Sequence, residues 1–418
     1  MKYVIIGNSA AGIGCVEGIR QIDKNGGITV ISDEPHHTYS RPLISYFVQG
    51  KITAEKMKYR EDGFYRDNAV TLLSGVSAVR IDSDKKTVAL SDGKTVSTVS
   101  YDKLLVATGS RAFEPPVEGI DSVKCKNSFM TMLDAQKLES LIAHEKRVLI
   151  VGAGLIGLKC AEGLLRRVSA ITVIDAAPSV LASILDSDGA RLVQNRFEEK
   201  GVKFILSKSV RRFDGNCAVL SDGDRIYFDI AVIATGVQPN TELLSGIVEI
   251  GRGIVINEKS ETSIPDIYAA GDCTESIDVS SGARKIMALL PNAYMQGECA
   301  GVNMAGGDKS FDRAIPMNAV GFIGLHIITA GNYTGEVYES IKNGAYKKLF
   351  YSDNRLNGYI FIGDLEKAGI YTGLIRDRTP LDSIDFTLIC EKPGLMAFTK
   401  EDRMAKLGGV YEHIGARS

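Results

Sequence analysis

Residues 147–175 read RVLIVGAGLIGLKCAEGLLRRVSAITVID, and this stretch decides the fold. It opens on a short apolar run, Val148–Val151, which leads into a turn with three glycines in a GxGxxG pattern. A helical pattern follows, and a second apolar run, Ile171–Ile174, ends on Asp175. A strand, a glycine-rich turn, a helix, a strand and an acid in this order predict a βαβ unit that binds a dinucleotide.

The three glycines and the acid have separate tasks in such a unit. Gly152 permits the tight turn, Gly154 lets the backbone approach a pyrophosphate, and Gly157 lets the helix pack closely on the strand. The phosphates lie at the positive end of the helix dipole. Asp175 can accept hydrogen bonds from a ribose 2′-hydroxyl and repels a 2′-phosphate, and no arginine follows it closely. The sequence therefore favours NADH over NADPH.

The same pattern opens the chain. The apolar run Tyr3–Ile6 leads into GNSAAG, residues 7–12, where Ser9 stands at the usual position of the middle glycine. After a helical segment, a second apolar run ends near Asp33 and Glu34; either carboxylate could bind a ribose, and Glu34 is favoured. A chain with two such units must bind two dinucleotides, or one that is split across both.

A further pair of segments is also repeated. Strand-like runs end on Ala107-Thr108-Gly109 and on Ala234-Thr235-Gly236, and each is preceded by the hairpin signal Ser-Asp-Gly. The repeated order predicts two homologous α/β units, each with a small antiparallel insert. Both turns would then lie at the carboxyl ends of parallel strands, where such folds bind ligands.

Polar residues outside these repeats could also contact a cofactor. Arg41 lies in the segment YSRP, where a guanidinium could bind phosphate, although a solvated loop arginine would give the same pattern. Asp272 follows a third short strand and could bind the sugar alcohol chain of a cofactor or cap a helix. A helix predicted from Pro291 to about Asn303 would present its positive N-terminus to negative charge on a cofactor.

The remaining segments are less specific. Residues 51–66 are charged and predict a surface helix. From Ile315 the pattern changes to strands at 346–351 and 358–362 and a helix at 364–375, which predicts an α+β domain.

Composition limits the classes of function. A length of 418 residues predicts two or three domains, and a net charge of −2 gives no basic surface for nucleic acid or an anionic membrane. The longest strongly apolar run is too short to span a bilayer, and the first strand leaves no room for a signal peptide, so we expect a cytoplasmic protein. The seven cysteines contain no CxxC pair and no metal-ligand spacing, so we expect neither disulfides nor a metal site.

The motifs GNSAAG, YSRP, ATGS, GAGLIG, ATGVQPN and TSIPDIYAAGD, in this order, resemble those of the pyridine nucleotide–disulfide oxidoreductase superfamily. Within it, the segments YSRPLIS, LPNAYMQGECAGVNMAGG and GYIFIGDLEKAGIYTGLI are similar to NADH:rubredoxin oxidoreductases and to the flavoprotein part of NADH-dependent nitrite reductases. The resemblance implies FAD and NAD(H) as cofactors. It also implies an α/β fold with two Rossmann-like domains, as in glutathione reductase, and a C-terminal α+β domain.

The implied domains are a discontinuous FAD-binding domain, residues 1–112 and 245–314, an NAD-binding domain, residues 113–244, and a C-terminal α+β interface domain, residues 315–418. The resemblance assigns to FAD the following residues: Gly7, Ser9, Ala10, Ala11 and Gly12 at the pyrophosphate, Asp33 or Glu34 at the ribose, Arg41 and Pro42 near the phosphates and flavin, Ala107, Thr108 and Gly109 beside the cofactor, and Asp272 at the ribityl chain. It assigns to NAD(H) Gly152, Gly154, Leu155, Ile156 and Gly157 at the pyrophosphate, Asp175 at the ribose and Gly236 on the nicotinamide side.

The sequence departs from the superfamily at two points. Disulfide reductases carry redox-active cysteines shortly after the first ribose acid, but this chain has no cysteine between Cys15 and Cys125. A thiolate relay is therefore not expected, and electrons must leave the flavin directly. Relatives commonly have a glutamate where this chain has Lys159. This lysine could stabilise the anionic reduced flavin, or its side chain could extend into solvent.

These features imply an enzyme that passes electrons between NADH and a one-electron iron–sulfur carrier, which would be rubredoxin, ferredoxin or a partner subunit. Three alternatives stay open: an NADH oxidase, the flavoprotein component of a nitrite reductase, and a flavoprotein redox sensor. A homodimer or a hetero-oligomer is possible in each case.

Overall fold

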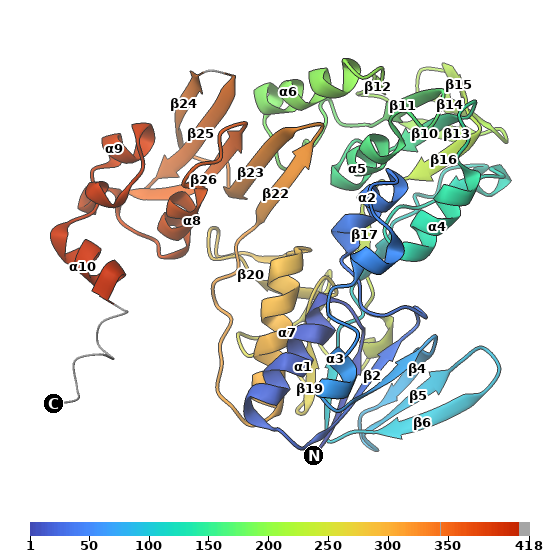
Figure 1. Ribbon diagram of the computed structural model, residues 1–418, viewed down its shortest axis with the longest axis vertical. Coiled ribbons are helices and arrows are strands. Elements are labelled where there is room, and N and C mark those ends of the chain that lie inside the picture. Colours follow the sequence, from blue (N-terminus) through green and yellow to red (C-terminus); the bar gives the residue numbers. More distant parts are fainter. Residues whose placement is uncertain (343, 409–418) are drawn as a thin grey trace. The chain divides into compact units, whose positions relative to one another are not determined.

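The computed structural model describes residues 1–342 and 344–408, with side chains described as far as residue 404. The chain divides into two compact units. The first contains Met1–Ile277 and Arg284–Asp312, and the second contains Asp278–Ala283 and the residues from Arg313 onward. The mixed α/β architecture of the first unit, with its parallel sheets, confirms the expected fold class (Figure 1).

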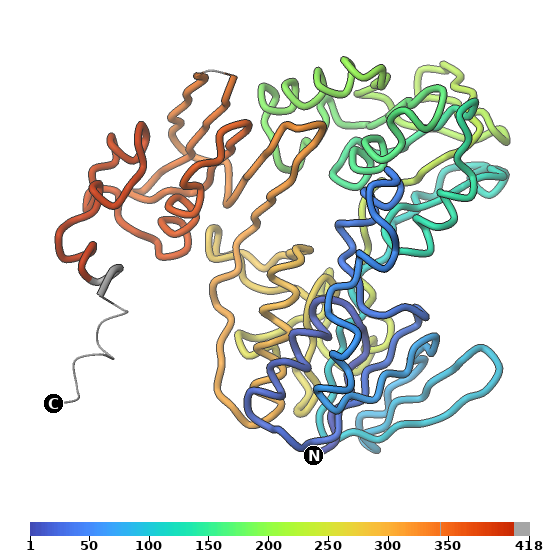
Figure 2. The backbone as a smooth tube through the Cα atoms, viewed as in Figure 1, coloured from blue at the N-terminus to red at the C-terminus, as the bar shows by residue number. Residues whose placement is uncertain are grey.

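The first unit contains a five-stranded parallel sheet in the order β19-β7-β1-β2-β3. Its strands are β1 (Lys2–Ile6), β2 (Gly27–Ser32), β3 (Val70–Ser74), β7 (Lys103–Val106) and β19 (Ile267–Ala269). The last of these strands comes from a late part of the chain, so this half of the unit is built from two separate segments. Figure 2 shows these segments, at the blue and golden positions of the colour bar, running through the same part of the unit.

A second five-stranded parallel sheet repeats this arrangement in the order β12-β11-β10-β16-β9. Its strands are β9 (Lys126–Asn127), β10 (Arg147–Val151), β11 (Ala170–Ile174), β12 (Lys203–Ile205) and β16 (Ile230–Ile233). In both sheets the strand before the glycine turn, β1 or β10, is central. On one side it pairs with the strand that leads to the acid, β2 or β11, and on the other side with the strand that leads to the Ala-Thr-Gly turn, β7 or β16. The repeat predicted from the sequence is thus a repeat in three dimensions.

A small antiparallel sheet is inserted in the chain of each repeat, before the strand that leads to the Ala-Thr-Gly turn, as the two Ser-Asp-Gly signals predicted. The first contains β4 (Ser77–Asp82), β5 (Thr87–Ser91) and β6 (Val96–Ser100), and the second contains β13 (Val210–Phe213), β14 (Cys217–Leu220) and β15 (Arg225–Tyr227). Asp92 forms the first turn, because its carboxylate accepts hydrogen bonds from the backbone N–H groups of Lys94 and Thr95. Short strands β8 (Ser110–Ala112) and β17 (Val237–Pro239) pair with each other, and β18 (Ile254–Val255), β20 (Thr274–Ile277) and β21 (Arg284–Ile286) form a third small sheet.

The helices of the first unit are α1 (Ala10–Ile22), α2 (Ile44–Val48), α3 (Phe64–Asp67), α4 (Met132–Leu141), α5 (Leu155–Leu164), α6 (Ser187–Glu198) and α7 (Leu290–Met304). Short 3₁₀ turns are η1 (Arg41–Leu43), η2 (Ala54–Met57), η3 (Ile120–Ser122) and η4 (Glu242–Leu244). Helices α1 and α7 lie side by side (Figure 1). A Cβ added at Gly297 would meet the carbonyl oxygen of Ala11 at 1.9 Å, so glycine permits this close packing of the two helices.

The second unit contains a five-stranded antiparallel sheet in the order β22-β23-β26-β25-β24. Its elements are β22 (Met317–Phe322), β23 (Leu325–Gly331), β24 (Glu336–Lys342), β25 (Ala345–Ser352), β26 (Arg355–Ile362), α8 (Ala368–Arg376), η5 (Leu381–Ser383), α9 (Phe386–Glu391), η6 (Leu395–Ala397) and α10 (Lys400–Gly408). The α+β character predicted for this region is confirmed. Tyr359, Phe361 and Tyr371 form an aromatic cluster between the sheet and α8.

Two sequence predictions need correction. Residues 51–66 do not form one surface helix: only η2 and α3 are helical, because the backbone of Met57 and Tyr59 pairs with residues 38–40 instead. In the second unit, the predicted helix at 364–375 begins only at Ala368, after Lys367, which has a left-handed φ of 60°. No helix in the described part of the chain is long and apolar enough to cross a membrane.

Candidate nucleotide-binding sites

The two glycine-rich turns have the same geometry. The N–H of Gly7 donates to the carbonyl oxygen of Ile31 at 2.8 Å, and the N–H of Gly152 donates to that of Ile174 at 2.7 Å. Each first glycine has a positive φ, 121° at Gly7 and 114° at Gly152, which disfavours other residues. These hydrogen bonds fix each turn at the carboxyl end of the central strand of its sheet.

Glycine is also required where each helix begins. A Cβ at Gly12 would lie 2.0 Å from the carbonyl oxygen of Gly7, and a Cβ at Gly157 would lie 2.0 Å from that of Gly152. Gly154 differs from these positions, because a Cβ there would meet no protein atom within 4 Å. Its backbone is extended, with φ −79° and ψ −171°, a conformation open to any residue. The protein itself therefore does not require glycine at position 154, whereas a closely approaching ligand would.

Asp175 has a structural task in addition to the predicted one. One carboxylate oxygen accepts a hydrogen bond from the N–H of Ala153 at 2.6 Å, and the other accepts from the N–H of Ala177 at 2.8 Å. The acid thus holds the glycine turn to the end of β11. Each oxygen keeps a second lone pair that could accept from a ribose hydroxyl.

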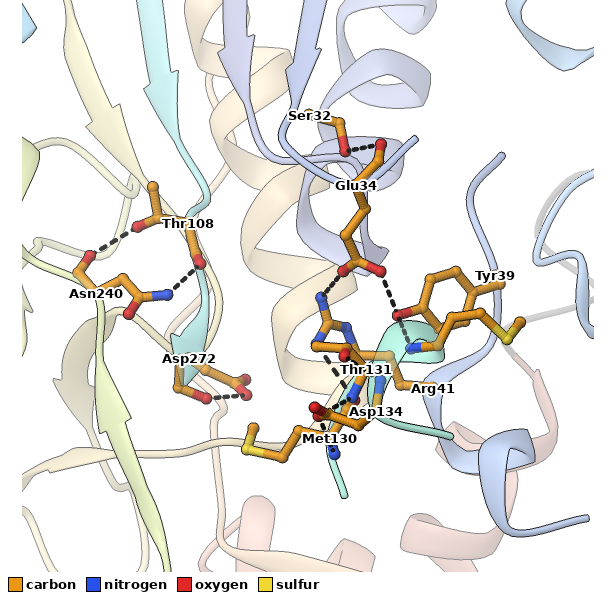
Figure 3. Close-up of polar contacts among 12 residues, drawn as sticks. Ser32, Glu34, Tyr39, Arg41, Thr108, Met130, Thr131, Asp134, Asn240 and Asp272 are labelled. Carbon is orange, nitrogen blue, oxygen red and sulfur yellow. Dashed lines mark hydrogen bonds and ion pairs between the residues drawn. The ribbon is translucent and has the colours of Figure 1, made fainter. Parts of the chain in front are cut away.

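A polar network surrounds Arg41 in the first half of the unit (Figure 3). The guanidinium donates to Glu34 at 2.8 Å and to the carbonyl oxygen of Met130 at 3.4 Å. The hydroxyl of Tyr39 donates to the second oxygen of Glu34 at 2.7 Å and accepts from the N–H of Met132 at 2.9 Å. Arg41 is therefore held in an ion pair and is not merely a solvated loop residue. Both oxygens of Glu34 accept from protein groups, but each keeps a second lone pair, as in Asp175, so Glu34 and the neighbouring exposed Asp33 both stay ribose candidates.

The Ala-Thr-Gly turn of the first repeat is bound by the second. Thr108 Oγ1 donates to the carbonyl oxygen of Asn240 at 2.7 Å, and the side chain amide of Asn240 donates to the carbonyl oxygen of Thr108 at 2.9 Å. This reciprocal pair, visible in Figure 3, fixes the turn that contains Ala107, Thr108 and Gly109. Asn240 belongs to the motif ATGVQPN, but the sequence pattern assigns this side chain no role.

Asp272 lies in the turn that follows β19, and its predicted contact with a ribityl chain stays a prediction. Ser110 Oγ donates to it at 3.3 Å, and a Cβ added at the preceding Gly271 would lie 3.2 Å from the Cβ of Ala11. The turn of Asp272 thus packs against the start of α1, beside the first glycine-rich turn. Burial raises the pKa of Asp272 above its ordinary value, and Ser110 and Arg41 only partly offset this effect.

Helix α7 brings further polar groups to the same turn. Gln296 Oε1 accepts from the N–H of Gly271 at 2.9 Å, and its amide donates to Ser276 at 3.2 Å. Asn292, one helical turn earlier, is only 6% exposed, and its Nδ2 has no hydrogen-bond partner within the described part of the chain. The sequence predicts the helix, but only the structure reveals the contacts of these two side chains.

Lys159 lies on α5 and is mostly shielded from solvent. Its ammonium forms an ion pair with Glu162 at 2.7 Å and lies 5.7 Å from the centre of the Tyr46 ring on α2. Its side chain is 21% exposed, so it does not extend freely into solvent. Its effect on a flavin stays a prediction.

The described residues fit the two dinucleotides. The first site combines a helix N-terminus at a glycine turn, a buried carboxylate and the buried, unpartnered amide of Asn292. The second combines the N-terminus of α5, the open space at Gly154 and an acid at the end of β11. Among the described residues, no group of three or more His, Cys, Asp or Glu side chains could hold a metal ion.

Replacing Asp272 by Asn should stabilise the apoprotein and weaken FAD binding. Burial raises the pKa of the folded carboxyl above 3.8, so the folded state binds the proton more tightly than the unfolded state. The wild-type protein therefore loses folding stability as the pH rises from about 3.8 through the pKa of Asp272 in the folded state. The Asp272→Asn variant has no ionisable group at this position and avoids this loss. Melting temperatures of the apoproteins at pH 4 and pH 7 test this: the advantage of Asp272→Asn should grow with pH, and a pH-independent difference would contradict it. FAD affinity should fall about tenfold with the lost charge-assisted hydrogen bonds.

Two repeated βαβ units with these sites define a class of enzyme, the oxidoreductases that use both a flavin and a pyridine nucleotide. Comparison with known proteins agrees. A family model described as pyridine nucleotide-disulphide oxidoreductase matches residues 1–297, and one described as rubredoxin NAD+ reductase C-terminal domain matches residues 316–379. The chain therefore belongs to the pyridine nucleotide–disulphide oxidoreductase family, and it is an NADH-dependent oxidoreductase with FAD and NAD(H) as cofactors.

Individual relatives extend over most of the chain. The chain is 32% identical to the NADH-dependent phenylglyoxylate dehydrogenase subunit epsilon of Aromatoleum evansii, over 91% of this chain and 92% of that relative. It is also 32% identical to the assimilatory nitrate reductase electron transfer subunit of Bacillus subtilis (strain 168), over 90% of this chain. The match covers 49% of that relative, so the chain spans about half of its length. The putidaredoxin reductase–putidaredoxin complex contains a solved chain of the same fold, with a TM-score of 0.86, 24% identity, and coverage of 97% of this chain and 98% of that one.

Proposed function

We propose that this protein passes electrons between NADH and an iron–sulfur protein, either a soluble carrier such as rubredoxin or ferredoxin or a partner subunit, without a cysteine relay. The observation that carries this proposal lies in the sequence that follows the first ribose acid. Residues 16–124 contain no cysteine, and Arg41 and Pro42 follow the ribose acid instead. Burial raises the pKa of Cys15 and of Cys273, so neither thiol is disposed to act as a thiolate.

The similarities of both units support an iron–sulfur partner. Residues 316–379 match the C-terminal domain of rubredoxin reductases. The relative from Aromatoleum evansii is named as a subunit of an NADH-dependent dehydrogenase, which favours a partner subunit as one form of the acceptor. FAD held in the first site would supply the conversion between a two-electron hydride donor and a one-electron carrier, which such a partner requires.

Within this proposal, the residues of the chain bind and orient the two cofactors. Gly7–Gly12 and α1 bind the FAD pyrophosphate, Glu34 or Asp33 binds the ribose, and Asp272 binds the ribityl chain. The network of Glu34, Tyr39 and Arg41 holds Arg41 and Pro42 near the phosphates and the flavin, and Asn240 fixes Ala107–Gly109 beside them. In the second site, Gly152–Gly157 bind the NAD(H) pyrophosphate, Asp175 binds the ribose, and Gly236 lies on the nicotinamide side.

Anaerobic stopped-flow spectroscopy tests the function. The purified yellow protein is mixed with NADH and then with oxidised rubredoxin, ferredoxin, nitrite or air. Rapid bleaching followed by fast reoxidation with one iron–sulfur protein is expected. Fast reoxidation by air alone would favour an NADH oxidase. Slow reoxidation by every acceptor would favour a redox sensor or a protein that needs a missing subunit, such as the flavoprotein component of a nitrite reductase.

Reversing the charge of Lys159 should lower the reduction potential of the bound flavin. In Lys159→Glu, a negative charge beside Glu162 disfavours the more negative, reduced cofactor. At a fixed potential the ratio of reduced to oxidised flavin should fall about tenfold, or about 30 mV for a two-electron couple. Potentiometric titration measures this, with Lys203→Glu, an exposed residue of β12, as the matched control. Equal potentials in the two variants would refute a role for Lys159 in tuning the flavin.

The proposed domains are residues 1–112 with 245–314 for FAD, 113–244 for NAD(H) and 315–418 as the interface domain. A cytoplasmic location and a homodimer or hetero-oligomer accompany the proposal. Size-exclusion chromatography with light scattering, with and without the iron–sulfur partner, tests the assembly.

A further inference from the structure

The antiparallel sheet of the second unit ends on an open edge at β24. This strand pairs on one side with β25, from Glu336 opposite Tyr351 to Lys342 opposite Ala345. No strand in the described part of the chain pairs with its other side (Figure 1). Backbone N–H and C=O groups along an unpaired edge can bind a further strand.

Two apolar side chains are exposed at this edge. Val337 is 47% and Ile341 is 66% exposed, and Glu339 lies between them on the same face of the sheet. Their neighbours in β25, Phe350 opposite Val337 and Tyr346 opposite Ile341, are buried. The exposed pair therefore extends an apolar face to the edge of the sheet, where an added strand would cover it.

The sequence of β24, EVYESIK, is complementary to its own reverse. When two copies pair in antiparallel register centred on Glu339, Glu336 of one copy lies opposite Lys342 of the other, and Val337 lies opposite Ile341. Cross-strand pairs of opposite charge and of apolar side chains stabilise a sheet. The two-fold axis of such a pair repeats each contact, so every favourable pair occurs twice.

The charges of the strand also fit this register. Glu339 would face the same residue of the second copy, but its carboxylate forms an ion pair with Lys348 of β25 at 3.1 Å. Two glutamates and two lysines would therefore neutralise each other at the axis. Glu336 and Lys342 are exposed, and neither forms an ion pair with a residue that the structure describes. Their charges remain available to a second copy.

We propose that β24 is a homodimer interface, at which two copies of this chain join their C-terminal sheets edge to edge in antiparallel register centred on Glu339. The occupant is a second copy because the charge order along β24 matches its own reverse. The other edge strand of the sheet, β22, has no charged residue and offers no such match. The inference rests on the proposed function only in specifying the homodimer that accompanies it, and electron transfer does not depend on it.

Sedimentation velocity of the full-length, FAD-loaded protein at several concentrations measures the dimer dissociation constant. Glu336→Lys places two lysines opposite each other at both ends of the interface, and Lys342→Glu places two glutamates there. Each variant should raise the dissociation constant about tenfold, because two attractive pairs become repulsive. The double variant Glu336→Lys/Lys342→Glu restores opposite charges at both ends and should return the constant to the wild-type value.

A mixture of the two single variants tests the register directly. In a mixed dimer each lysine lies opposite a glutamate, so the mixture should dimerise about as tightly as the wild-type protein. The matched control is Lys94→Glu, an exposed residue in the turn of the first antiparallel insert, which should leave the constant unchanged. Melting temperatures should be equal in all variants at concentrations where they are monomeric, because both charges lie at the surface.

A monomeric wild-type protein at every concentration would overturn the proposed interface. So would a dimer that the single variants do not weaken, or one that neither the double variant nor the mixture restores. The rate of flavin bleaching by NADH separates this result from the proposed function. Wild-type bleaching in all variants would leave electron transfer standing even if the interface fails, whereas a wild-type protein that NADH does not bleach would overturn the proposed function alone.

Discussion

Gly154→Val should raise the KM for NADH about 100-fold while the protein keeps its FAD and its stability. An added Cβ meets no protein atom within 4 Å, and the φ of −79° suits any residue, so the fold should tolerate the side chain. The side chain would instead occupy the space in front of the α5 N-terminus, where the proposed pyrophosphate must approach the backbone. A 100-fold weaker affinity corresponds to about 2.8 kcal/mol of binding free energy, which is the loss expected for one or two hydrogen bonds from the backbone to the charged pyrophosphate.

Flavin bleaching by NADH and the melting temperature of the apoprotein together check this result. The matched control is Gly27→Val at the start of β2, where an added Cβ also meets nothing within 4 Å and no nucleotide is proposed. Gly157→Ala gives a useful contrast, because its Cβ would lie 2.0 Å from the carbonyl oxygen of Gly152 and should disturb the fold itself. An unchanged KM in Gly154→Val would show that the pyrophosphate does not bind at this turn.

Asp175→Asn should reduce the preference for NADH over NADPH about 100-fold. The amide keeps one oxygen acceptor but has no negative charge. In the wild-type protein, that charge repels a 2′-phosphate and strengthens the hydrogen bond from a 2′-hydroxyl. Loss of a charge-assisted hydrogen bond of about 1.5–3 kcal/mol accounts for tenfold or more in NADH binding, and relief of the repulsion adds to the change in the ratio. Steady-state kinetics with both nucleotides and one artificial acceptor measure kcat/KM for each.

The substitution also costs stability, because Asp175 accepts from the N–H groups of Ala153 and Ala177 and an amide can replace only one of these oxygens. Asp229→Asn is the matched control. Asp229 accepts from the backbone N–H of Arg147 at 2.8 Å, at the amino end of β10, away from the proposed nucleotide. It should lose comparable stability without a change in nucleotide preference. If Asp175→Asn and Asp229→Asn changed the preference for NADH over NADPH equally, a general loss of stability, and not the charge of Asp175, would account for the change.

The sequence alone determined the repeated framework of this protein. The strand before each glycine turn, the acid at the end of the next strand and the Ala-Thr-Gly turn were all predicted, and the structure has them in the same order in both parallel sheets. These features are local and can be recognised in the sequence. A strand is a short apolar run, and a backbone position with a positive φ or with a carbonyl group in close contact requires a glycine. The small antiparallel sheets were predicted for the same reason, since Ser-Asp-Gly is a local turn signal.

The polar side chains that support the sites are recognised from contacts between distant parts of the chain. Tyr39 contacts the N–H of Met132, and Thr108 contacts Asn240, although about 90 to 130 residues separate the partners in the chain. Such contacts form through space and leave no periodic trace in the sequence. The lack of a hydrogen-bond partner for Asn292 Nδ2 among the described residues is visible only when every neighbouring acceptor is placed. Likewise, residues 51–66 read as a helix by local charge pattern, but backbone pairing with residues 38–40 outweighs that preference.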